Sequence, residues 1–139
     1  MEIIANAVQT VLTNQNVVFT DNVICGNGSI THRDDSGLVT LSGATNQCRA
    51  RYKIGFGANV AIPTGGAVGP ISLAIALEGE VLPATTMIVT PAAVENYFNI
   101  HSATFIDVPQ GCCATISIKN ITTASVLVQN ANLIVERVA

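Results

Sequence analysis

The chain has 139 residues, the usual length of one domain, and we expect a single domain over residues 1–139. A net charge of −3 and an isoelectric point near 5.1 leave no basic face for a polyanion, which argues against a nucleic-acid-binding protein. The sequence is 49% hydrophobic and only 11% charged, yet no apolar run reaches the roughly 18 residues of a membrane helix. We therefore expect a soluble chain whose apolar surface is covered by other subunits.

Short runs rich in Val, Ile and Thr recur along the chain, and turn residues separate them. Gly and Asn accept a positive φ and Pro fixes its own, so Asn27-Gly28, 63–66 and 109–111 each predict a turn. The predicted strands cover residues 8–12, 17–19, 29–32, 38–41, 47–62, 71–82, 87–90, 97–108, 113–119 and 125–137.

Alternation with a period of two is clearest in the predicted strand 71–82. Ile71, Leu73, Ile75 and Leu77 share one face, and the other face carries small or polar residues. Faces built from Thr, Ser, Ala and Asn suit contact with a neighbouring subunit better than contact with water, and such contacts also cover strand edges.

Helical periodicity is weak throughout, and the only helix-like patch, residues 91–96, is one or two turns long. Many short strands, each with one apolar face, indicate an antiparallel sheet structure. The sequence therefore predicts an all-β sandwich or barrel.

Arg49, Arg51 and Lys53 form the one basic cluster, and their spacing places all three on one face of a strand. We expect a solvated or salt-bridged stripe. The four cysteines, Cys25, Cys48, Cys112 and Cys113, include no CxxC pair. Residues 1–10 lack the basic and apolar regions of a secretory signal, so we expect a cytosolic chain with free, buried thiols.

No arrangement of residues predicts catalysis. His32-Arg33-Asp34 matches three letters of a kinase loop without the other kinase motifs, and Gly55-Phe56-Gly57 lacks the third glycine and the helix of a dinucleotide motif. Neither His32 with Asp34 and Asp35 nor His101 with Asp107 has the spacing of a metal site. We expect no catalytic, cofactor-binding or metal-binding residues.

Several stretches of the chain, spread from about Asn16 to the end, match motifs of a known family. They are NQCRARY at 46–52, IPTGG at 62–66, ISLAIAL at 71–77, VPQGCC at 108–113 and VQNANLIV at 128–135. They resemble the tumour-necrosis-factor/complement-like jelly rolls of bacterial collagen-like surface proteins and of small structural proteins of tailed phages.

This resemblance implies a two-sheet antiparallel jelly roll that assembles as a homotrimer. It also implies that the C-terminal strand, residues 125–137, lies in the inner sheet near the threefold contact. On that basis the expected trimer-interface residues are Tyr97, Phe98, Leu127, Leu133 and Val135.

No Gly-X-Y stalk precedes the matched region. We therefore expect residues 1–7 to act as an N-terminal docking arm, with Glu2, Ile3 and Ile4 on the partner. These features favour a non-enzymatic capsid decoration protein, made in the host cytoplasm and bound to the major capsid protein on the virion surface.

The alternative is a receptor- or glycan-binding knob of a phage fibre, a tail tip or a bacterial surface protein. Its binding loops would be those around Asp34-Asp35, 64–69 or 120–123. Host glycans commonly stack on aromatic rings, and the chain has no Trp and only Tyr52 and Tyr97 as tyrosines, which weakens this alternative.

Overall fold

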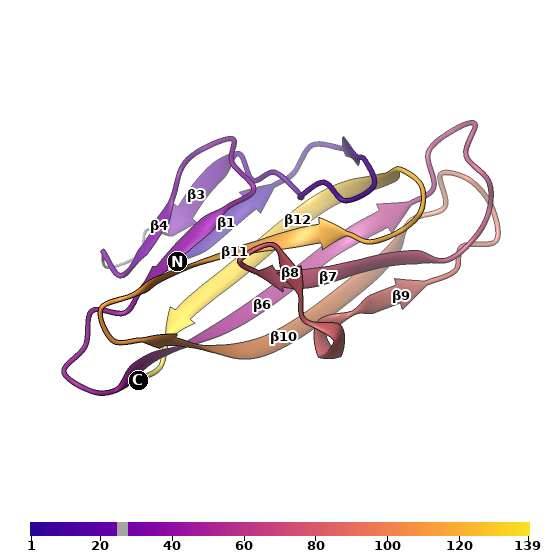
Figure 1. The fold of residues 1–139 in the computed structure, drawn as a ribbon. Helices are drawn as coiled ribbons and strands as arrows, with labels where there is room; N and C mark the ends of the chain where they lie inside the picture. The colour runs from indigo at the N-terminus through magenta and orange to yellow at the C-terminus, as the bar shows by residue number, and fades with distance from the viewer. Residues whose placement is uncertain (25–27) are drawn as a thin grey trace.

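A computed structural model describes residues 1–24 and 28–139, which form an all-β sandwich of two antiparallel sheets (Figure 1). Cys25 and part of the predicted Asn27-Gly28 turn lie outside the described residues. No helix in the described chain is long and apolar enough to cross a membrane. The elements are β1 (Glu2–Ala5), β2 (Gln9–Val11), β3 (Asp21–Ile24), β4 (Ile30–His32), β5 (Val39–Ser42), β6 (Arg49–Ala61), β7 (Ile71–Leu77), β8 (Glu80–Val81), the 3-10 turn η1 (Pro83–Thr85), β9 (Met87–Val89), β10 (Phe98–Pro109), β11 (Cys113–Asn120) and β12 (Val126–Arg137).

The strands divide into two layers. Sheet A has the order β10-β6-β12-β1-β3, with β2 beside β12, and sheet B has the order β4-β5-β11-β7-β8, with β9 beside β7. The longest ladder joins β10 to β6 without interruption, from the pair Phe98 and Val60 to the pair Pro109 and Arg49. This arrangement confirms the predicted two-sheet antiparallel sandwich.

The core lies between the sheets and follows from strict alternation along the long strands. On β6, Tyr52, Ile54 and Phe56 point inward and have no exposed surface, and each such side chain contributes about 1.5–3 kcal/mol on burial. The rings of Phe19 and Phe56 pack edge to face at a centroid distance of 6.3 Å. The Tyr52 hydroxyl donates to the Ser42 carbonyl oxygen at 2.7 Å, so the buried phenol is satisfied.

Within the docking arm expected over residues 1–7, Glu2–Ala5 form strand β1 of sheet A instead of a free extension. β1 lies between β12 and β3 in sheet A, with Ile3 opposite Leu133, and the Met1 amino group donates to the Val135 carbonyl oxygen at 2.8 Å. Alternation explains the outcome, because Ile3 and Ala5 belong to the buried face of an ordinary sheet strand.

Other boundaries also differ from the predictions. Strand β3 was not predicted, because its residues are mostly exposed and carry no apolar alternation. Residues 17–19 bury Val17 and Phe19 without forming a strand. The predicted strand 71–82 divides at Glu78 and Gly79, whose φ values of 53° and 80° form a two-residue hairpin turn. Residues 91–96 form bends and a turn, not a helix.

Candidate interaction surface

The outer face of sheet A, the side that points away from the core, is poor in side chains at its centre. Gly55 lies on this face in the middle of β6, and a Cβ atom built there would meet no atom within 4 Å. In the sheet register, Ala103 of β10 lies opposite Gly55 on one side and Ile134 of β12 on the other. The result is a strip of open backbone over β10 and β6, bounded by Ile134 on β12.

Large apolar side chains flank this strip. Phe105 stands on the outer face of β10 with 62% of its surface exposed, and Ile134 is 47% exposed on β12. Ile24 of β3, 57% exposed, lies further across the same face, in the row that contains Glu2 and Ile134. Exposed apolar groups around a flat, open strip are typical of a surface that binds another protein.

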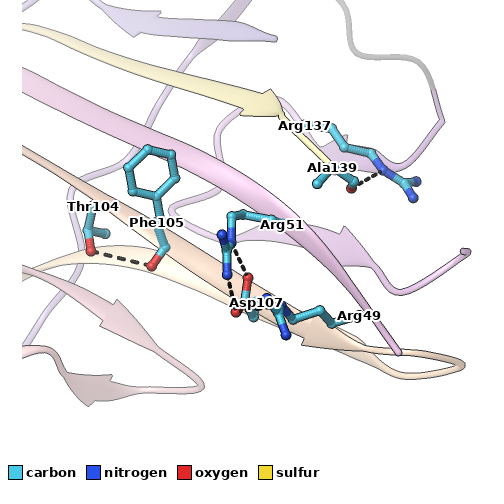
Figure 2. Close-up of polar contacts among 7 residues, drawn as sticks. All are labelled: Arg49, Arg51, Thr104, Phe105, Asp107, Arg137 and Ala139. Atoms are coloured by element: carbon cyan, nitrogen blue, oxygen red, sulfur yellow. Dashed lines mark hydrogen bonds and ion pairs between the residues drawn. The ribbon is translucent and has the colours of Figure 1, made fainter. Parts of the chain in front are cut away.

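Arg49 and Arg51 of the basic stripe lie at one end of this face and are salt-bridged, which was one of the two expectations for the stripe. Asp107 accepts hydrogen bonds from Arg51 Nε at 2.8 Å and Nη2 at 3.1 Å, and its carboxylate lies 3.0 Å from Arg49 Nε (Figure 2). The hydrogen bond from Arg51 lowers the pKa of Asp107, and the same contact raises the pKa of Arg51. All three side chains are well exposed, so the cluster contributes little to stability.

The predicted trimer-interface residues fall in different places. Leu133 and Val135 are fully buried between the sheets, so the prediction that they form an interface is wrong: alternation turns both into the core of their own subunit. Leu127 is half-buried on the outer face of sheet A. Tyr97 and Phe98 are 36% and 38% exposed at the start of β10.

The predicted docking residues are also divided by alternation. Ile3 is fully buried and cannot contact a partner, so that prediction is wrong. Glu2 and Ile4 are half-buried on the outer face of sheet A, and the Glu2 carboxylate accepts a hydrogen bond from Asn132 Nδ2 at 3.1 Å. The two side chains therefore belong to the same surface as Ile134 and not to a separate arm.

Sequence analysis missed Phe105 and Ile134, although a signal was present. The odd positions of the predicted strand 97–108 form its non-core face, and Phe105 is a large aromatic residue among small and polar ones. In the same way Ile134 lies out of phase with its buried neighbours Leu133 and Val135. A large apolar residue at a strand position that alternation turns away from the core indicates that the outer face is covered by a partner.

A pocket of about 610 Å³ lies at the end of the sandwich where β6 ends. The 62–70 connection and the 121–125 connection form its walls, so two of the three loops suggested for glycan binding meet there. The third, around Asp34 and Asp35, lies in the β4–β5 connection and does not line this pocket. The Thr122 hydroxyl is bonded to the backbone of Ser72: Thr122 Oγ1 donates to the Ser72 carbonyl oxygen at 3.1 Å and accepts a hydrogen bond from the Ser72 amide at 2.8 Å.

Two of the residues considered for metal binding, His32 and Asp107, are engaged otherwise. The His32 ring nitrogens lie 2.6 Å from Asn22 Oδ1 and 2.9 Å from the Ser36 carbonyl oxygen, and Asp107 is paired with arginines. Within residues 1–24 and 28–139, no group of three His, Cys, Asp or Glu side chains is placed to hold a metal ion.

The cysteines differ from expectation in one respect. Cys48, Cys112 and Cys113 are free, but all three are exposed instead of buried. Cys48 and Cys112 lie in connections at the end of the sandwich where β6 begins, and Cys113 is the first residue of β11, so core packing does not explain the three thiols.

Comparisons with known proteins place this architecture. The globular domain of zebrafish complement 1qA protein superposes with a TM-score of 0.64 over 96% of this chain and 93% of its own, at 13% identity. Murine APRIL superposes with a TM-score of 0.59 over 95% of this chain and 96% of its own, also at 13% identity. The chain has the tumour-necrosis-factor/complement-like jelly-roll fold.

The structural comparisons show the fold, and the comparisons of the sequence do not. No family model matches the sequence, and no curated protein matches it. At 13% identity the two similar structures establish the fold. The role of the domain has to be inferred from its surfaces, because one fold supports many functions.

Proposed function

We propose that this jelly roll is a non-enzymatic structural protein that assembles as a homotrimer through the outer face of sheet A and decorates a phage capsid. The observation that carries the proposal is the open strip at Gly55, flanked by the exposed side chains of Phe105 and Ile134. A monomer would leave this apolar strip in water. A second copy packed on it would bury the exposed apolar area at about 25 cal/mol per Å².

The shape of this face favours protein contact over ligand binding. Gly55 and Ala103 allow a partner to approach the backbone closely, and Phe105 supplies an aromatic anchor of the kind enriched at the centre of interfaces. Charged groups border the apolar side chains on this face: Lys53 lies opposite Phe105 in the β10–β6 ladder, and Glu2 lies opposite Ile134. The paired Arg49 and Arg51 lie at one end of the face.

The first experiment measures the native mass of the recombinant chain by light scattering, with two matched variants. Phe105→Asp places a charge on the outer face of sheet A, and Ile88→Asp places one on β9 of sheet B, where Ile88 is 64% exposed. We expect a trimer for the unaltered chain and for Ile88→Asp, and a monomer for Phe105→Asp. A monomeric unaltered chain would contradict the assembly.

The capsid assignment is supported by the sequence resemblance to small phage structural proteins and by the sparsely charged composition. Its partner would be the major capsid protein, and its location the virion surface. Mass spectrometry of purified virions, followed by labelling with an antibody against the chain, tests this directly. Absence from virions, or labelling of the tail tip instead of the head, would overturn the decoration role.

A second candidate function rests on the pocket at the end of β6. Its lining contains no charged side chain and offers hydroxyl groups and the backbone of several glycines, which suits a neutral polyhydroxy ligand such as a host glycan. Gly69 lines this pocket, and a Cβ atom there would meet nothing within 4 Å, so Gly69→Gln adds a long side chain at the pocket lining without a clash. A glycan array in which the unaltered chain binds and Gly69→Gln does not would support the knob; no binding would remove it.

A further inference from the structure

Three exposed thiols gather at the end of the sandwich opposite the pocket. Cysteine is among the residues most often buried, yet Cys48, Cys112 and Cys113 are all exposed and free. Cys48 ends the β5–β6 connection, and the other two follow the turn that joins β10 to β11. Neither the fold nor the proposed assembly surface uses these thiols.

The two connections are held firmly against each other. The Gln110 amide donates to the Cys48 carbonyl oxygen at 2.9 Å, and the Gly43 amide donates to the Cys112 carbonyl oxygen at 2.7 Å. A Cβ atom at Gly43 would lie only 2.1 Å from the Pro109 carbonyl oxygen, so the backbones pack without room for a side chain. The relative positions of Cys48 and Cys112 are therefore set by main-chain contacts.

The register brings these two cysteines close together. Pro109 lies opposite Arg49 in the β10–β6 ladder, so Gln110 lies opposite Cys48, with Cα atoms roughly 4.5–5.5 Å apart. The Cys112 amide donates to the Pro109 carbonyl oxygen at 3.1 Å, which closes a turn whose ends lie within about 7 Å. A disulfide requires Cα atoms about 4.4–6.8 Å apart, a separation within reach of this arrangement.

Strand parity distinguishes Cys112 from its neighbour. Cys48 precedes the buried Ala50 of β6 by two residues, and Cys112 precedes the buried Ala114 of β11 by two residues. The two thiols therefore lie next to the first residues of strands that belong to opposite sheets. Cys113 has the opposite parity and belongs to the outer face of sheet B.

We propose that Cys48 and Cys112 are a redox pair that forms a reversible disulfide between the two sheets. One thiolate attacks a small-molecule disulfide, forms a mixed disulfide and releases one thiol. The second thiolate then displaces the other half as a thiol. The protein pair is oxidised, the small disulfide is reduced to two thiols, and the two protons lost by the cysteines pass to the released thiolates.

The bridge would join chain segments about 64 residues apart and reduce the entropy of the unfolded chain. In a reducing cytosol the pair stays as the free thiols seen here, and in an oxidising medium it closes. The domain then gains stability when it leaves the cell that made it. For a chain of this length, we expect closure to raise the Tm by roughly 5–15 °C.

The test treats the folded chain with excess oxidised glutathione, blocks the remaining thiols, and measures intact mass, Tm and disulfide-linked peptides. Cys113→Ser serves as the matched control beside Cys48→Ser and Cys112→Ser. We expect the unaltered chain and Cys113→Ser each to form one disulfide within the chain, which consumes two thiols, and to show a higher Tm. The disulfide-linked peptide should contain Cys48. Cys48→Ser and Cys112→Ser should show neither change.

Three results would overturn the proposal. The first is a folded chain that keeps all its thiols. The second is an internal bridge that persists in Cys48→Ser, which would identify a vicinal Cys112–Cys113 disulfide or a link to Cys25. The third is a disulfide-linked dimer, in which the thiols join separate chains instead of the two sheets.

Discussion

The outer faces of the two sheets look alike in sequence and differ in the folded chain. On sheet B, Ala74, Ala76 and Ser117 have the parity of outward-pointing residues, yet only 0%, 0% and 3% of their surfaces are exposed. On sheet A, the comparable small positions Gly55 and Ala103 stay open. Small residues on an outer face can therefore indicate either that the same chain covers them or that the face is open to binding by another chain.

The chain itself provides the cover on sheet B. The Lys119 side chain on β11 extends to the β7–β8 turn, where its Nζ donates to the Gly79 carbonyl oxygen at 3.4 Å. The Glu78 carboxylate in the same turn accepts a hydrogen bond from the backbone amide of Thr115 on β11. On sheet A, a Cβ atom at Gly55 would meet no atom within 4 Å, and Phe105 and Ile134 remain exposed beside it. The difference marks sheet A as the face for self-association.

The largest expected effect separates the inner and outer faces of one strand. Leu133→Asp places a charge in the core and should cost roughly 4 kcal/mol or more, enough to unfold the domain. Ile134→Asp, one residue further along, lies on the outer face and should change the free energy of unfolding of the monomer by about 0.5 kcal/mol or less. Urea denaturation followed by circular dichroism measures both. Equal losses would contradict the assignment of these two faces.

An intermediate effect compares the two outer faces directly. Ala76→Leu should overpack the covered face of sheet B and cost about 1–3 kcal/mol in the same denaturation measurement. Gly55→Leu meets open space and should leave the unfolding free energy of the monomer almost unchanged, while it weakens the trimer in light scattering. A destabilised Gly55→Leu monomer would show that the sheet A strip is filled by the chain itself.

The smallest effect concerns the charged margin of sheet A. Because hydrogen bonding from Arg51 lowers the pKa of Asp107 in the folded state, this pair stabilises the fold above about pH 4, and the contribution is lost as the pH falls through the folded pKa. Asp107→Asn should remove that part of the pH dependence and otherwise change Tm only slightly, since the pair is exposed. Tm curves of the two proteins from pH 2 to 7 should converge at the acid end. Curves that stay parallel throughout would contradict the pairing.

Local patterns predicted much of the fold. Alternation located most of the long strands, and turn residues such as Pro109 to Gly111 located their ends. The errors came from short strands. β1 and β3 have few residues, and apolar and polar positions alternate only weakly along them. They form strands because β1 pairs with β12 and the two pair with each other.

The candidate surface was only partly predictable. The resemblance correctly indicated the jelly-roll fold, but it carried no register, so Leu133, Val135 and Ile3 were assigned to interfaces although they face the core. A shift of one residue along a strand moves a side chain to the other face of the sheet. Register is a property of paired strands, and in this chain it also decides that Phe105 is exposed.

The sequence by itself determined that this is an all-β domain rich in apolar residues and sparse in charged ones, because period-two alternation, turn chemistry and composition act locally or over the whole chain. Only the tertiary structure decided which small residues are covered, which loops meet in the pocket, and that Cys48 and Cys112 lie on touching connections. Those features join residues far apart along the chain, and their proximity arises when two sheets pack and register is set.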